Sequence, residues 1–216
     1  MTTQPLQVPL QHISYVLNFF MIMGVIAASM SGALRAIKAR MDITGAILLA
    51  FITANAGGTV RDLILETPVF WIQQQFYIWL TLIVGAATFG ILYLKRHVIG
   101  SKKLYKILIT TDAMGLAAFS LAGVEKAVSC NQNSMVAIIM GIWTAIGGGI
   151  LADTISNQVP LVLSQELYIT VSCVGSVIYL TLAKTMNSML AGVIAVLVMF
   201  LFRIYSVKYH VRYPTF

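Results

Sequence analysis

The sequence of this chain repeats itself, and each copy of the repeat contains an odd number of predicted membrane spans. Residues 23–64 align with residues 114–155 without a gap, at a constant offset of 91 positions, and fourteen of the 42 aligned positions are identical. The register continues to Tyr77 and Tyr168. With three spans in each copy, the second copy must enter the membrane upside down. Inverted repeats of this kind are typical of proteins that move a solute across a bilayer.

Composition places the chain in a membrane. Hydrophobic residues make up 59% of the 216, and charged residues only 10%, whereas a soluble domain has about 25% charged residues. The net charge of +7 does not predict nucleic-acid binding, because the basic residues cluster in short segments between apolar runs. The first apolar run lacks the basic segment that precedes a cleavable signal, so we expect it to remain as a span.

Seven apolar runs are suited to cross the hydrocarbon core, which takes about 20 residues of helix. We expect an all-α polytopic membrane protein forming one integral domain, with a first three-helix repeat at 13–95, a second, inverted repeat at 104–184 and a seventh helix at 187–207. The predicted spans are 13–34, 43–60, 76–94, 105–124, 134–152, 164–183 and 187–206.

The basic residues also predict the orientation. Eleven of the fourteen fall in the loop between spans one and two, the loop between spans three and four, and the C-terminal tail, while Arg61, Lys126 and Lys184 fall on the other side. Because lysine and arginine favour the cytoplasmic face, we expect an N-out, C-in protein. The eleven are Arg35, Lys38, Arg40, Lys95, Arg96, Lys102, Lys103, Lys106, Arg203, Lys208 and Arg212.

Adjacent glycines interrupt spans two and five at matched positions. Each glycine weakens a helix by about 1 kcal/mol relative to alanine. Two interpretations are open: small residues allow close helix packing, or the glycines kink helices that line a pathway. Their occurrence in both inverted copies favours paired kinks. The candidate kink residues are Gly57, Gly58, Gly147, Gly148 and Gly149.

Polar residues accompany these glycines. Thr53 and Thr144 lie one helical turn before Gly57 and Gly148, so each hydroxyl shares a face with a glycine carbonyl that could hold a hydrated cation, or else bonds its own helix. Asp62 and Asp153 follow the glycines by four residues and should lie toward opposite membrane faces. They are candidate vestibule carboxylates, or else charges in water at helix ends. Asn55 and Arg61 complete the candidate polar set, and Ala152 stands where the second copy would need the arginine.

The sequence offers no pattern for enzyme chemistry. The three histidines are scattered at positions 12, 97 and 210, and no Gly-Lys-Ser/Thr follows the triple glycine. Cys130 and Cys173 have neither metal-ligand nor disulfide spacing. We therefore expect no enzyme activity, no catalytic residues, no metal site and no cofactor.

The segment AGGTVRDLILETPVFW, residues 56–71, resembles the glycine-rich, Arg-Asp signature of a bacterial membrane family related to the trimeric intracellular cation (TRIC) channels. The second copy, GGGILAD, lacks the arginine. The resemblance extends over about residues 13–206. It implies a homotrimer in which each protomer has its own pore between the repeats, with glycine-kinked second and fifth helices at its centre.

The resemblance also implies a function. TRIC channels conduct monovalent cations, mainly potassium, so we expect potassium as the permeant ion, sodium as a second candidate, and membrane lipids and other copies of the chain as partners. Some bacterial relatives are described as glycine transporters, and a secondary transporter for a small amino acid therefore stays as the alternative. A bacterial inner membrane is the expected location.

Overall fold

The structure is a computed structural model that describes residues 10–95, 102–163 and 167–211. Arg96, Arg212 and the start of the sixth predicted span lie outside these ranges. Helices and one short 3-10 turn, η2, are the only regular elements within the ranges. They are α1 (Leu10–Lys38), α2 (Ile43–Ile64), α3 (Phe70–Gln73), α4 (Phe76–Leu94), α5 (Lys102–Ser129), α6 (Ser134–Ile155), η2 (Leu161–Leu163), α7 (Tyr168–Leu182) and α8 (Ser188–Lys208).

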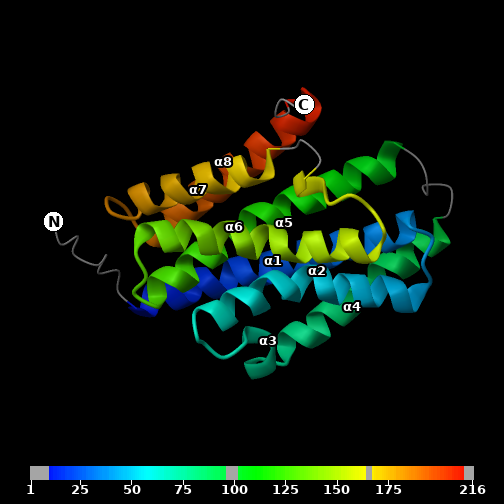
Figure 1. Ribbon diagram of the computed structural model, residues 1–216, viewed down its shortest axis with the longest axis horizontal. Coiled ribbons are helices and arrows are strands. Elements are labelled where there is room, and N and C mark those ends of the chain that lie inside the picture. Colours follow the sequence, from blue (N-terminus) through cyan, green and yellow to red (C-terminus); the bar gives the residue numbers. More distant parts are fainter. Residues whose placement is uncertain (1–9, 96–101, 164–166, 212–216) are drawn as a thin grey trace.

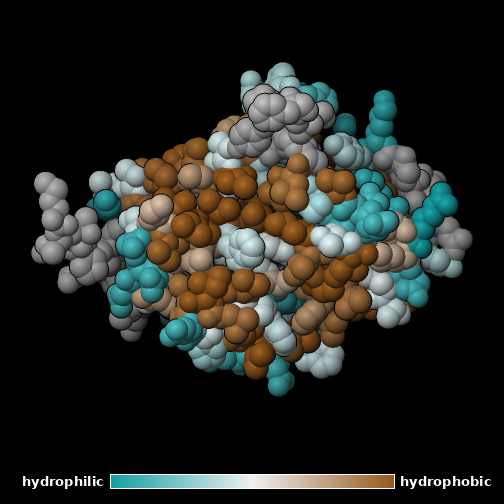
Figure 2. All heavy atoms as spheres, viewed as in Figure 1, coloured by the Kyte–Doolittle hydropathy of each residue, from teal (hydrophilic) through white to brown (hydrophobic). Residues whose placement is uncertain are grey.

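Seven of these helices correspond to the seven predicted spans. Six are long and apolar enough to cross a membrane, and α7 is a shorter apolar helix of 15 residues. Apolar side chains cover the middle of the face in Figure 2, and hydrophilic residues gather toward both ends of the long axis. The all-α polytopic class is confirmed. The short elements α3 and η2 were not predicted, because segments of three or four residues leave no hydropathy signal.

The helix ends repeat along with the spans. The side chain of Asp42 accepts a hydrogen bond from the Gly45 amide at 2.8 Å and begins α2, and Asn133 accepts one from the Val136 amide at 2.9 Å and begins α6. Such side chains cap the free amides of a first helical turn. Asp42 and Asn133 are 91 positions apart, so the local structure is kept where the residue has changed.

Four helices form the centre of the molecule. Figure 1 shows α1, α2, α5 and α6 in the middle, with α3 and α4 on one side and α7 and α8 on the other. The most extensive contacts join α1 to α5, and α2 contacts α6 directly. Gly57 of α2 lies against the carbonyl oxygen of Thr144, and Gly148 of α6 lies against that of Thr53. Reciprocal contacts of this kind are the mark of two-fold symmetry, so α2 and α6 cross on the pseudo-two-fold axis of the repeat.

The structure corrects part of the loop assignment. Arg35 lies in the last turn of α1 and Arg203 lies within α8, and their side chains are only 6% and 1% exposed. Arg61 is likewise buried, within α2. Buried arginines are not loop charges, because they face other helices. Without these three, nine basic residues remain on the predicted cytoplasmic side and two on the other side. The N-out, C-in orientation stays a prediction.

Candidate functional site

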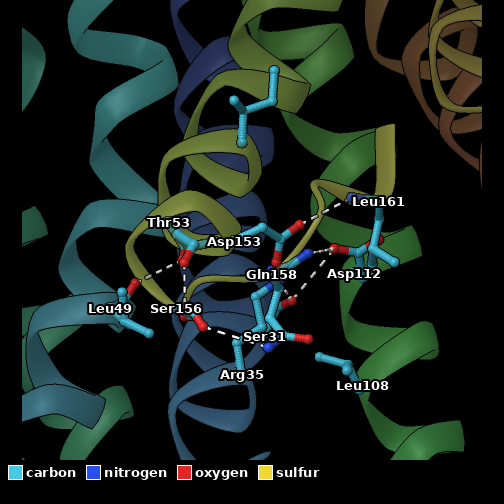
Figure 3. A network of polar contacts seen from close by, with 12 residues as sticks. Ser31, Arg35, Leu49, Thr53, Leu108, Asp112, Asp153, Ser156, Gln158 and Leu161 are labelled. Atoms are coloured by element: carbon cyan, nitrogen blue, oxygen red, sulfur yellow. Dashed lines mark hydrogen bonds and ion pairs between the residues drawn. The ribbon is translucent and has the colours of Figure 1, made fainter. Parts of the chain in front are cut away.

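A buried ionic cluster joins three helices near the end of α1. Arg35 Nη2 pairs with Oδ1 of Asp112 in α5 at 2.7 Å, and Arg35 Nε pairs with Oδ1 of Asp153 in α6 at 2.8 Å (Figure 3). Arg35 Nη1 donates to Ser31 Oγ, one turn earlier on α1, at 2.7 Å. The Tyr168 hydroxyl, at the start of α7, donates to Oδ2 of Asp112. These five residues are called the Arg35 cluster below.

The Arg35 cluster holds the helices together by charge. Its one guanidinium faces two carboxylates, so an ionised cluster has a formal net charge of −1. Side-chain exposure is 6% for Arg35, 10% for Asp112 and 8% for Asp153, so water screens these pairs weakly. Removing one partner of such a pair leaves a buried charge without compensation, at a cost of about 3–5 kcal/mol. The cluster therefore strongly favours the arrangement of α1, α5 and α6 seen here.

Asp153 also fixes the segment that follows α6. Its second oxygen, Oδ2, accepts a hydrogen bond from the Leu161 amide at 3.1 Å, at the first residue of η2. The same carboxylate thus ties the loop after α6 to the arginine of α1. Any movement of Arg35 away from Asp153 releases one of the two restraints on this carboxylate.

Two cavities border the Arg35 cluster. The inner cavity, of about 30 Å³, is lined by residues that include Ala28, Thr53 and Gly149. The outer cavity, of about 130 Å³, is lined by residues that include Lys38, Ala39 and Gln158. Arg35, Asp153 and Leu161 line both. The inner cavity has room for about one water molecule and the outer one for several, and the Arg35–Asp153 pair forms part of the wall of both.

A second ionic pair lies toward the opposite end of the helical bundle. Arg61 Nη2 and Nε contact Oδ1 of its neighbour Asp62 at 2.6 and 2.8 Å. Oδ2 of Asp62 accepts a hydrogen bond from the Phe70 amide at 2.9 Å, as Oδ2 of Asp153 does from Leu161. Both aspartates and both amides are 91 positions apart. The carboxylate that ties down the segment after the helix is therefore a repeated feature, whereas the arginine partner is not.

The two pairs are far apart along α1. Arg61 Nη1 lies 3.8 Å from the sulfur of Met21, while the other pair is formed by Arg35. Met21 and Arg35 are fourteen residues apart in one helix, which corresponds to about 21 Å at 1.5 Å per residue. Asp62 and Asp153 therefore lie toward opposite ends of the helical bundle.

The predicted glycines occupy different environments. Gly57, Gly147 and Gly148 lie at the crossing of α2 and α6, Gly58 faces the ring of Phe70, and Gly149 faces the Arg35 guanidinium. The close contacts at the crossing agree with the packing interpretation of these small residues. Both helices continue through their glycines as α-helix. A bend of either axis stays a prediction.

The predicted hydroxyl and amide groups bond mainly to their own helix. The hydroxyls of Thr53 and Thr144 donate to the carbonyls of Leu49 and Met140, each at 2.6 Å. Asn55 Nδ2 donates to the Phe51 carbonyl at 2.9 Å. Thr53 also lines the inner cavity.

Sequence reasoning missed most of the Arg35 cluster. In the sequence, Arg35 falls in a predicted loop, Tyr168 contributes only to the repeat register, and Asp112 is not among the candidate residues. A signal was present, because Asp112 lies inside the predicted span 105–124, where a charge is costly and usually has a partner.

Comparison with known proteins identifies the family. The family model described as "Glycine transporter" matches residues 18–93 and again residues 109–184. A solved TRIC channel orthologue from Rhodobacter sphaeroides is 32% identical, with a TM-score of 0.81 over 90% of this chain and 98% of the channel. The chain belongs to the TRIC family. A second solved prokaryotic TRIC channel is 28% identical, with a TM-score of 0.83 over 93% of this chain and all of that one.

Curated relatives give this TRIC protein its location. A membrane protein of Vibrio cholerae is 38% identical over 94% of this chain and 82% of its own length. The inner membrane protein YadS of Escherichia coli K12 is 32% identical over 90% of this chain and 93% of its own length. The protein is accordingly an integral membrane protein of the bacterial inner membrane.

Proposed function

We propose that this TRIC protein is a monovalent cation channel that conducts potassium, with sodium as a second permeant ion. Its pathway runs inside each protomer, between the repeats at 13–95 and 104–184, while the seventh helix at 187–207 completes the single membrane domain. The observation that carries the proposal is the pair of cavities that Arg35 and Asp153 both line. Two cavities that share the same ionic pair are the two parts of one interrupted path.

Charge suits this path to cations. Asp112 and Asp153 bring two carboxylates to the junction of the cavities, against the single guanidinium of Arg35. Carboxylates along a narrow path favour cations and exclude anions. While Arg35 bridges the two aspartates, its positive charge and its side chain block passage, so the arrangement described here is closed. Opening requires Arg35 to leave the junction, which exposes both carboxylates to the permeant ion.

The rest of the path follows the crossing of α2 and α6. The inner cavity touches Thr53 and Gly149, and the tight contacts of Gly57 and Gly148 lie next to it. Beyond the crossing the path reaches the Arg61–Asp62 pair. Gly58, Gly147, Asn55 and Thr144 complete the set of residues that we assign to the path and its bends.

The protein functions as a homotrimer in this proposal, with one path in each protomer and membrane lipids around the assembly. The Rhodobacter sphaeroides orthologue is a trimeric intracellular cation channel. Many large apolar side chains of this chain are exposed in a single protomer, including Trp79 at 63% and Leu201 at 62%. Such surfaces suit contact with lipid or with another copy of the chain.

A transporter for a small amino acid such as glycine is the second candidate. The description of the matching family model favours it, and the Arg35 cluster offers both charge signs that a zwitterion needs. A transporter would bind its substrate at saturable sites, whereas a channel passes many ions through weak sites in each opening.

Planar bilayers under a potassium gradient separate the two functions. The purified protein is expected to give unitary current steps that reverse near the potassium equilibrium potential. Silence in bilayers, together with saturable uptake of labelled glycine into proteoliposomes made from the same preparation, would reject the channel and support the transporter.

A further inference from the structure

The seventh span, α8, lies outside the repeat but reaches the Arg35 cluster through one residue. The guanidinium carbon of Arg203 lies 3.8 Å from the centre of the Tyr168 ring. A cation at this distance over an aromatic face is attracted by the ring. The Tyr168 hydroxyl donates in turn to Asp112, which pairs with Arg35. A continuous series of contacts therefore runs from α8 through α7 and α5 to α1.

Burial makes this series well defined. The side chain of Arg203 is 1% exposed and Tyr168 is 5% exposed. A planar guanidinium stacked on a buried ring restricts how the ring can turn. The ring in turn sets where its hydroxyl meets Asp112, so the position of Arg203 affects the carboxylate that holds Arg35.

At the opposite end of the bundle, the described residues form no matching series. Tyr77 is the counterpart of Tyr168, but the position that matches Asp112 is Met21, which has no carboxylate to accept a hydrogen bond. α8 packs against α5 and α7, which belong to the second repeat. The contact with Arg203 is therefore specific to the end of the molecule that holds the Arg35 cluster.

We propose that Arg203 is a positioning residue for the closed channel: acting through Tyr168, it orients Asp112 and so helps hold Arg35 across the path. Movement of α8 relative to α7 then changes how readily the path opens. This makes the helix outside the repeat the regulatory element. The inference rests on the proposed channel function, because it assigns Arg203 a role in closing that path.

Single-channel open probability in planar bilayers with potassium tests the inference. Tyr168→Phe keeps the ring and removes the hydroxyl, and Arg203→Met removes the cation. Each should raise the open probability about tenfold, as expected for a lost hydrogen bond to a charged group or a lost buried cation–ring contact. Arg203→Lys keeps a cation near the ring but loses the planar guanidinium, so its open probability should fall between those of the wild type and Arg203→Met.

A double-mutant cycle separates positioning from general weakening of the fold. If Arg203 acts through the Tyr168 hydroxyl, Arg203→Met should change the open probability by less than about twofold in the Tyr168→Phe background. Tyr77→Phe is the matched control and should leave the open probability unchanged. Effects of Tyr168→Phe and Arg203→Met that simply multiply would overturn the inference, as would an unchanged open probability in the correctly assembled Tyr168→Phe variant.

The same recordings distinguish failure of this inference from failure of the channel proposal. A wild-type protein without potassium current rejects the channel. A wild-type current that responds to Arg35→Met but not to Tyr168→Phe or to Arg203→Met retains the channel and rejects only the role of Arg203.

Discussion

The two ends of the molecule are built on the same aspartate but use it differently. At one end Asp62 pairs with Arg61, its neighbour in the same helix, and at the other Asp153 pairs with Arg35 from a different helix. This pair joins adjacent residues of one helix, and the contact of Arg61 with α1 is to the uncharged sulfur of Met21. A pair between α1 and α6, extended to α5 by Asp112, resists their separation. The comparison teaches that matched aspartates can serve one helix at one end of the molecule and join three helices at the other.

Substitutions between the copies account for this difference. The positions that match Asp112, Arg61 and Arg35 are Met21, Ala152 and Lys126. The second copy lacks the local arginine, and its end of the molecule has the carboxylate of α5 instead. The helices are arranged with pseudo-two-fold symmetry, but the buried charges at the two ends differ. Matched variants at the two ends therefore test what this difference in charge does.

The largest expected effect separates the two arginines. Arg35→Met leaves Asp112 and Asp153 facing each other at the junction of the cavities, so the closed state loses its bridge. Potassium flux into proteoliposomes should rise by about tenfold or more, the change that corresponds to about 1.4 kcal/mol. Arg61→Met removes a cation from the proposed path but breaks no ion pair between helices, so its flux per folded protein should rise by less than that of Arg35→Met.

Stability measurements control for damage to the fold. Both arginines are buried beside carboxylates, so both variants are expected to lose thermal stability. Flux is therefore compared only between preparations with the same oligomeric size in detergent. Equal increases in flux for Arg35→Met and Arg61→Met would show that the two ends do not differ in the way described.

A smaller effect, on stability, is expected from glycine substitutions at the crossing of α2 and α6. A Cβ at Gly57 or Gly148 would collide with the backbone of the facing helix, whereas one at Gly149 would meet only Arg35 Nη2, at 3.7 Å. Gly57→Ala and Gly148→Ala should each lower stability by about 1–3 kcal/mol through overpacking. Gly149→Ala should be neutral or stabilising, because alanine favours helix. Thermal unfolding in detergent measures all three.

The matched glycine variants also distinguish packing from bending. A packing role predicts similar losses for Gly57→Ala and Gly148→Ala and an undisturbed current for Gly149→Ala. A loss of current in stably folded Gly149→Ala would instead favour the kink that the glycine pattern predicts, since that substitution fits the available space.

The number, order and approximate positions of the spans could be predicted from the sequence, because they depend on local hydropathy and on the internal repeat. The Arg35 cluster could not be predicted in the same way, because its members are 77 and 118 positions apart in the chain and meet only through helix packing. The contact of Arg203 with Tyr168 likewise depends on helix packing. From the sequence alone, a lone arginine near the end of a span is typical of an orientation signal.

The central claim is that the Arg35–Asp153 pair separates two cavities of one path, and reagent accessibility tests it directly. In a background with Cys130→Ser and Cys173→Ser, a cysteine is placed in the inner cavity by Ala28→Cys or in the outer one by Ala39→Cys. A small cationic thiol reagent should modify the Ala28→Cys protein about tenfold faster or more once Arg35→Met is added, while Ala39→Cys reacts at an unchanged rate. An Ala28→Cys rate that does not depend on Arg35 would contradict the account.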